Sequence, residues 1–246
     1  VCAECVKTLL RLKNDSDVYL DISKNMLNWL VNRQNTDGSW NEVHVNYNKP
    51  SSLVTSIVGD AIIDGYVHFK NDELAESAKN AMNFVLTNEV DDGYFQKSTL
   101  YRADHLNVDA TCGAFLSKYG LVFSDVSCSD AAQRVVRHIF DYQNKDGSFP
   151  YTVNDRGHYD KPLEVPCIHY QAVTIYFIIQ ILDSLNTDLQ YYDELNQAIS
   201  WLDGVLGKDG RFDWSKSGLM FSYYLSGAYA FTIPCFFMIK KRLIHI

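Results

Sequence analysis

Four copies of one short phrase, Asp-Gly followed within two residues by an aromatic side chain, divide this chain into units of similar length. Their glycines are Gly38, Gly93, Gly147 and Gly210, which lie 55, 54 and 63 residues apart. Each phrase follows an amphipathic run, and Asp-Gly ends a helix because glycine adopts the left-handed backbone conformation at little cost. A polar loop and a second, more apolar run come next. The pattern predicts two helices per unit, stacked side by side as helical hairpins.

Hydrophobic periodicity places the expected helices and sets the fold class as all-α. The helices are expected at residues 3–13, 18–33, 51–69, 72–86, 107–122, 129–142, 166–184, 189–205 and 218–240. No segment alternates polar and apolar residues well enough to predict a strand. We therefore expect one domain over residues 1–246, with about four hairpins and one extra helix curved into a closed or incomplete ring.

Composition excludes several classes of function. The net charge is −8 and basic residues gather only at 240–242, so no nucleic-acid partner is predicted. Polar residues interrupt the most apolar stretches, 172–182 and 219–239, so no membrane span is predicted. The six cysteines lack a disulfide framework and no secretory leader is visible, which favours a cytoplasmic protein. The lone Cys2–Cys5 pair is interpreted as two thiols on one helix face.

Two of the four phrases carry a family resemblance. Gln34-Asn-Thr-Asp-Gly-Ser-Trp40 and Gln143-Asn-Lys-Asp-Gly-Ser-Phe149 resemble the Q-x-x-D-G-S-W repeat of squalene–hopene cyclases, oxidosqualene cyclases and protein prenyltransferase β-subunits. The resemblance implies an (α/α) toroid. In addition, Asn107-Val-Asp-Ala-Thr-Cys112 resembles the D-x-D-D-T-A motif of class II terpene cyclases and the V-x-D-C-T-A motif of oxidosqualene cyclases. The aspartate that matches Asp109 is the acid that starts cyclisation in those families.

This resemblance gives the leading hypothesis, an enzyme that cyclises a bulky isoprenoid without a cofactor. Protonation of an alkene needs a neutral carboxylic acid in a dry pocket, and aromatic faces stabilise the cations that follow. We expect Asp109 to be the acid, with His105 and Tyr101 orienting it. The other interpretation of Asp109 is a helix N-terminal acid favoured by the helix dipole. The residues expected to line the cavity are Trp40, Tyr170, Trp214 and Tyr223.

The same loops also suit a carbohydrate ligand. In a ring of hairpins, the loops 41–52, 97–109 and 151–170, which enter the apolar helices, converge on the centre. Polysaccharide lyases and uronate epimerases with helical toroids abstract a proton beside a carboxylate, which needs a base, an acid and a cation. A hydrolase would use two carboxylates, here Asp109 and Glu164. The side chains that supply the first chemistry are Tyr101, Arg102, His105, His169 and Tyr170.

Two further possibilities concern metals and partners. Cys167-Ile-His169, after Asp160-Lys-Pro162, resembles the D-K-P…Y-H stretch of prenyltransferase β-subunits, where the histidine binds zinc. The Asp-x-Cys partner of that family is missing, so no metal site and no cofactor are predicted. The third functional alternative is a toroid without catalysis that binds a ligand or partner in its concave face. An exposed end helix, 3–13 or 218–240, would suit a homodimer.

Overall fold

The computed structural model describes residues 1–12, 17–44, 46–153, 163–218 and 224–243. Within them, helices account for most of the chain, as the periodicity predicted. Two short 3-10 helices, η1 (Asp188–Tyr191) and η2 (Trp214–Lys216), accompany the α-helices. The α-helices are α1 (Cys2–Arg11), α2 (Asp17–Val31), α3 (Ser52–Phe69), α4 (Asp72–Thr87), α5 (Leu106–Phe123), α6 (Val126–Asp141), α7 (Ile168–Leu185), α8 (Tyr192–Gly204) and α9 (Tyr224–Leu243).

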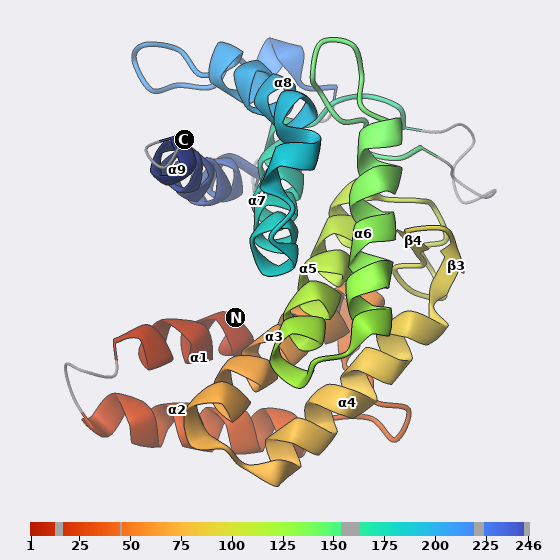
Figure 1. Cartoon of the computed structure of the whole chain (residues 1–246), viewed down its shortest axis with the longest axis vertical. Coiled ribbons are helices and arrows are strands. Elements are labelled where there is room, and N and C mark those ends of the chain that lie inside the picture. The colour runs from red at the N-terminus through yellow and green to blue at the C-terminus, as the bar shows by residue number, and fades with distance from the viewer. Residues whose placement is uncertain (13–16, 45, 154–162, 219–223, 244–246) are drawn as a thin grey trace.

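The α-helices form two concentric layers of a curved arc (Figure 1). The inner layer is the series α1, α3, α5, α7 and α9, in which each helix packs against the next. The outer helices α2, α4, α6 and α8 each pack against the inner helix of their own hairpin. The two ends of the arc, α1 and α9, lie apart on the same side of the view. The predicted all-α toroid of stacked hairpins is therefore confirmed.

Capping residues repeat with the hairpins. The inner helices α3, α5 and α7 each end at a residue in the left-handed conformation, Lys70, Ser124 and Asn186, with φ of 52°, 58° and 53°. The next outer helix then begins at once. The side chain of Asn71 accepts a hydrogen bond from Glu73 N at 2.7 Å at the start of α4, and Asp125 caps α6 in the same way. These caps satisfy backbone donors that a helix start leaves unpaired.

The prediction of no strands was wrong, because the structure contains two small antiparallel hairpins. β1 (Asn41–His44) pairs with β2 (Tyr47–Pro50), and β3 (Glu89–Asp91) pairs with β4 (Tyr94–Phe95). Strands of two to four residues are too short to show an alternating pattern. They form where the chain reverses after an outer helix, so the turn geometry rather than the hydrophobic pattern sets their pairing.

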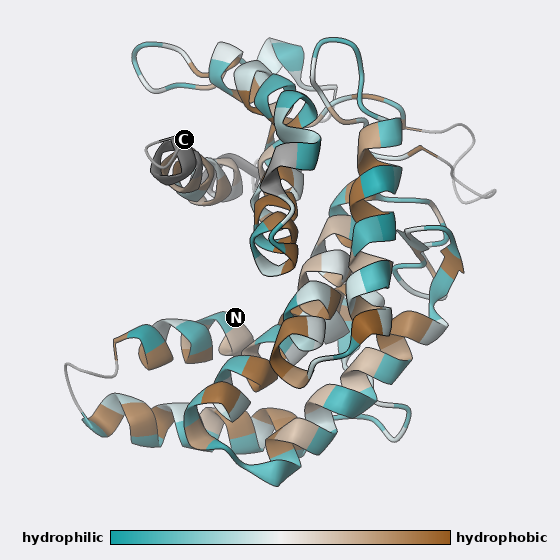
Figure 2. Cartoon of the chain, viewed as in Figure 1, coloured by the Kyte–Doolittle hydropathy of each residue, from teal (hydrophilic) through white to brown (hydrophobic). Residues whose placement is uncertain are grey.

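The core lies between the layers and along the inner helices. Every residue of α5 from 106 to 117 is buried, because α3 and α7 flank this helix and α6 covers it from outside. Figure 2 shows hydrophobic colour along α7, with hydrophilic colour on the solvent side of α6 and α8. No helix in the described part of the chain is both long and apolar enough to cross a bilayer.

The Asp-Gly turns dock each hairpin onto the next one. Gly38, Gly93 and Gly147 have φ of 87°, 85° and 90°. A Cβ atom at these positions would lie 2.1, 2.5 and 2.2 Å from a backbone carbonyl oxygen of the following outer helix. Only glycine therefore fits, for reasons of both conformation and space. Gly210 shares the conformation, with φ of 78°, but its Cβ would meet no atom within 4 Å.

Candidate functional site

The loops that enter the inner helices lie next to one another along one rim of the arc. Ser52 N, at the start of α3, donates to Lys97 O at 2.8 Å, which joins the first loop to the second. Val153 N donates to Asp104 O at 3.1 Å and joins the second loop to the third. Gly218 N donates to Pro166 O at 2.8 Å and ties in the approach to α9. These hydrogen bonds therefore hold the loops, and the side chains that they carry, next to one another.

Four rings from two of these loops form what we call the aromatic–histidine row: His105, Tyr151, Tyr170 and His169. Tyr151 and Tyr170 stack with centroids 4.8 Å apart and an interplanar angle of 22°. His105 meets Tyr151 edge-on at 5.1 Å, and His169 meets Tyr170 edge-on at 4.8 Å. Edge-to-face and offset stacked contacts are the favoured arrangements of aromatic rings. The row therefore holds two imidazoles and two phenols in a fixed order.

His169 stands in the first turn of α7 and is neutral at physiological pH. Burial lowers the pKa of its imidazole to about 4, because desolvation disfavours the charged form. Gly227 of α9 makes room for the ring, since a Cβ atom at that position would lie 2.4 Å from its Cε1 atom. Phe231 of α9 also contacts it edge-on at 6.2 Å. A neutral imidazole in an apolar setting can accept a proton from a bound molecule.

His105 is held in one tautomer at the residue before α5. Its ring is 2% exposed, and Nδ1 lies 2.7 Å from the carbonyl oxygen of Ala103. Because a carbonyl can only accept, this contact assigns the proton to Nδ1 and the lone pair to Nε2. Because His105 is buried against Tyr151, we interpret it as a residue that supports the Tyr151 ring rather than one that is exposed to solvent.

A second group lies at the entry to α3 and α5. The Lys97 ammonium lies 4.4 Å from the centre of the Tyr101 ring and 2.8 Å from Glu42 Oε1. Burial acts to raise the pKa of Glu42, but the hydrogen bond and charge of Lys97 outweigh it and the net pKa is lowered. Tyr47 meets Tyr101 edge-on at 6.4 Å. This group supplies a carboxylate, an ammonium and two phenols.

Asp109 lies in the wall between layers rather than facing the centre of the arc. It is fully buried, and its Oδ1 accepts a hydrogen bond from Phe95 N at 2.7 Å. The fourth residue of each neighbouring inner helix does the same for its own turn. Thr55 Oγ1 accepts from Trp40 N at 3.0 Å, and Gln171 Oε1 accepts from Phe149 N at 2.6 Å. Asp109 therefore occupies the position of the repeat that anchors the Asp-Gly turn.

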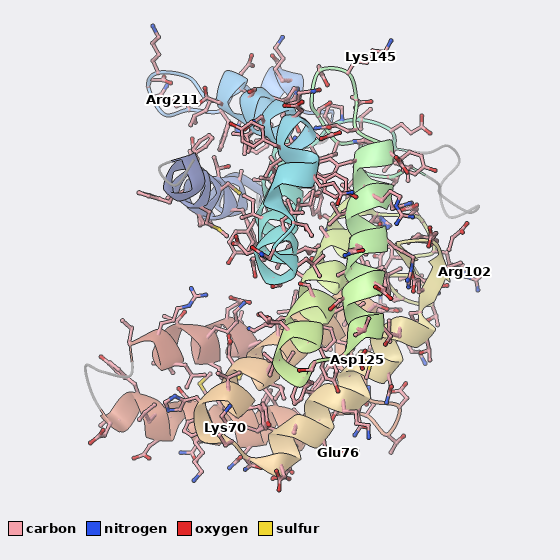
Figure 3. The ribbon with its side chains drawn as sticks, in the orientation of Figure 1. Lys70, Glu76, Arg102, Asp125, Lys145 and Arg211 are labelled. Carbon is pink, nitrogen blue, oxygen red and sulfur yellow. The ribbon has the colours of Figure 1, made fainter. Side chains whose placement is uncertain are left out.

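None of the other predicted site residues that the structure describes is a member of the row. Trp40 is 5% exposed and donates its indole N–H to Leu30 O at 2.9 Å, so it packs in the core. Arg102 is exposed and extends from the outer edge of the molecule (Figure 3). Glu164 is exposed on the third loop, and Trp214 in η2 packs edge-on against Phe212 at 6.0 Å. Tyr223 and residues 158–162 lie outside the described residues.

Sequence reasoning missed residues that the fold brings to the site region. Tyr151 lies two residues after the aromatic residue of the third Asp-Gly phrase, at the start of a loop that enters an inner helix. This place in the repeat could have identified it as a site residue. His138 comes from outer helix α6, which the loop-based search did not consider, yet its Nε2 lies 3.1 Å from Asp104 Oδ2. Cys167, which the sequence did bring into consideration, is buried at the N-terminal boundary of α7, and burial raises the pKa of its thiol.

Comparison with known proteins gave matches only among solved structures. No family model and no curated protein matches the chain. A possible member of the GH105 family from Salmonella enterica superposes with a TM-score of 0.78 at 11% identity, covering 97% of this chain and 70% of that one. A polysaccharide lyase gives 0.70 at 15% identity, with coverage of 97% and 73%. The cellobiose 2-epimerase of Spirochaeta thermophila gives 0.70 at 10% identity, with coverage of 96% and 70%.

These matches correct the family identification and the leading function. The similar structures are toroid enzymes whose names describe action on glycans, so the resemblance to terpenoid cyclases and prenyltransferases was wrong, and so was the isoprenoid cyclase hypothesis. The physical reason lies in the motifs themselves. The Asp-Gly phrase docks one hairpin on the next, and Asp109 anchors such a turn, so both signals report the architecture.

Proposed function

We propose that this protein acts on a carbohydrate bound at the loop end of the inner helices. The carrying observation is the aromatic–histidine row, in which two stacked tyrosines lie between two histidines. Tyrosine rings bind the apolar faces of sugars while their hydroxyl groups stay polar. The structural similarity to a polysaccharide lyase and a cellobiose epimerase supports the same class of ligand.

Within this class, the described residues favour proton abstraction from a sugar carbon next to a carbonyl or carboxylate group. His169 is neutral and partly buried beside Tyr170, so its nitrogen can take the proton while the electron pair passes to the neighbouring carbonyl carbon–oxygen unit. Return of the proton gives an epimer, and loss of a leaving group gives an unsaturated sugar. We assign His105 as a positioning residue behind Tyr151. The hydrolytic pair is disfavoured because Asp109 is fully buried at its turn.

The test follows solvent deuterium into the sugar. The protein is incubated in heavy water with uronate-containing oligosaccharides and with reducing disaccharides, and the sugars are analysed by mass spectrometry, ultraviolet absorbance and chromatography. We expect one of two products: an epimer that carries solvent deuterium at the carbon that lost its proton, or a cleaved sugar with a new double bond that absorbs ultraviolet light. His169→Gln should abolish formation of either product, because glutamine cannot take up a proton, whereas Tyr170→Ala should mainly weaken saccharide binding.

The matched control is Arg102→Gln, which changes a predicted residue whose exposed side chain extends from the outer edge of the molecule. It should leave both incorporation and binding unchanged. Cleavage that gives neither deuterium incorporation nor a new double bond would support a carbohydrate substrate and reject the proton-abstraction chemistry. Absence of both binding and turnover across the panel would reject the proposed function.

A further inference from the structure

A separate cluster of ionisable groups lies between the layers at the third hairpin, α5–α6. Asp104 Oδ2 is 3.1 Å from His138 Nε2, and Asp109 Oδ2 is 4.0 Å from the same nitrogen. One ligand atom from each of these residues lies within 4.8 Å of the others. The three residues come from the loop before α5, from α5 itself and from the outer helix α6, and so converge from separate segments.

The cluster carries more buried acceptor oxygens than the protein satisfies. Asp104 is 3% exposed and Asp109 is fully buried, and no described residue donates a hydrogen bond to Asp104 Oδ1 or Asp109 Oδ2. Two buried carboxylates this close cannot both stay charged without a positive group between them.

The neighbouring arginines do not supply that charge. Arg134 makes a bidentate contact with Glu89, at 2.9 and 2.7 Å, and also contacts Asp92. In the described part of the chain, no lysine or arginine forms an ion pair with Asp104 or Asp109. A groove of about 510 Å³ reaches the cluster from solvent, with Asp104, His138 and Tyr94 among its lining residues. An ion can therefore enter with its remaining water ligands.

We propose that Asp104, Asp109 and His138 bind a divalent cation. One imidazole nitrogen and two carboxylate oxygens suit Zn²⁺ or Mn²⁺ better than Ca²⁺ or Mg²⁺, which prefer sites built from oxygen alone. Ligand atoms about 2.0–2.2 Å from such an ion lie roughly 3 Å from one another. The 3.1 Å separation already meets this spacing, and the 4.0 Å separation needs only a small side-chain rotation.

The ion would join α5, α6 and the loop before α5. Asp104 precedes His105 directly, and its backbone oxygen accepts a hydrogen bond from Val153 at 3.1 Å. Fixing the Asp104 side chain on α5 and α6 would therefore stabilise the loops that carry the aromatic–histidine row. The binding itself is independent of any carbohydrate and of the proposed function.

The experiment titrates Zn²⁺ into chelator-treated protein by calorimetry and repeats the titration with Mn²⁺ and Mg²⁺. Cys2 and Cys5 on α1 are replaced by serine in every sample, because they could hold zinc on their own. We expect one Zn²⁺ per chain, weaker or absent Mg²⁺ binding, and a higher melting temperature with the ion. Anomalous scattering at the zinc edge should place the ion between Asp104 and His138.

The variants separate the ligands from their surroundings. Asp104→Asn and His138→Gln should each weaken Zn²⁺ binding by roughly 100-fold or more and remove the thermal shift. Asp109→Asn keeps an acceptor oxygen for Phe95 N, so the variant should fold. It should nevertheless bind Zn²⁺ more weakly than the parent protein, because it lacks one carboxylate ligand. The control is Asp141→Asn, an exposed acid in the same groove outside the cluster, which should bind normally. The proposal is overturned by absence of Zn²⁺ binding in the parent protein, or by binding that survives both ligand substitutions.

Discussion

At Asp60, one carboxylate meets two ammonium groups between the inner helices. Lys7 Nζ from α1 lies 2.6 Å from its Oδ2, and Lys118 Nζ from α5 lies 2.7 Å from its Oδ1. Burial acts to raise the pKa of Asp60, but the charges of Lys118 and Lys7 outweigh burial and hold the net pKa below its usual value. Lys118 also contacts Asp64 at 2.7 Å. This single residue therefore joins three helices of the inner layer.

Asp60→Asn should lower the free energy of unfolding by about 3 kcal/mol, because it leaves two ammonium groups short of their charge partner. The matched control is Asp64→Asn, whose carboxylate is 31% exposed and forms one ion pair within the described residues, with Lys118, and it should cost about 1 kcal/mol or less. Urea unfolding at neutral pH measures both. Equal losses for the two variants would contradict the central place given to Asp60.

A second residue-scale prediction concerns pH. The unfolded His169 imidazole takes up a proton near its ordinary pKa of about 6.5, whereas the folded one does so only at about 4. Between these values the unfolded state binds more protons, so stability falls as pH falls across that interval. Relative to His169→Gln, the parent protein should lose about 2 kcal/mol between pH 7 and pH 4, allowing for partial exposure of the ring. Parallel unfolding curves for the two proteins across this range would show that the ring titrates normally.

At the scale of elements, the helices were predictable and the direction of their side chains was not. The expected helix at 72–86 matches α4 (Asp72–Thr87), because Asn71 and the following Asp-Gly turn mark its two ends in the sequence. The role of Asp109 was not visible, since Thr55, Asp109 and Gln171 differ chemically although each is the fourth residue of an inner helix. The convergence of the loops was predictable from the stacking of hairpins. Which side chains reach the site, Tyr151 and not Trp40, depends on packing that no local pattern records.

The docking of turns on outer helices gives an element-scale prediction. Gly147→Ala places a methyl group 2.2 Å from Gln197 O at a φ of 90°, so the turn must separate from α8 and stability should fall by about 3 kcal/mol or more. Gly210→Ala meets only the conformational cost, about 1–2 kcal/mol. Thermal and urea unfolding of the two variants compare these costs directly. A loss at Gly210 as large as that at Gly147 would mean that conformation alone sets the requirement for glycine.

At the scale of the whole molecule, contacts run mainly between neighbouring hairpins. Such a structure behaves as a row of units stabilised by nearest neighbours, so its centre should open less often than its ends. We expect amide hydrogen exchange to be slowest in α5, which is flanked on both sides and buried from 106 to 117, and faster in α1 and α9. Exchange measured by mass spectrometry on peptides tests this order. Uniform protection across the inner helices would indicate a single cooperative unit instead.

The Asp-Gly turns also give the arc a polarity. The Gly38, Gly93 and Gly147 turns each point toward the outer helix that follows. Among the described residues, no outer helix docks on the Gly210 turn, which contacts α9 through Tyr229, and no Asp-Gly turn docks on α2. The two ends are thus complementary rather than alike. Any further hairpin or second molecule that used this geometry would join head to tail and continue the curve in one rotational sense. In a two-fold dimer that paired like ends, the Gly210 turn of one molecule would not dock on α2 of the other.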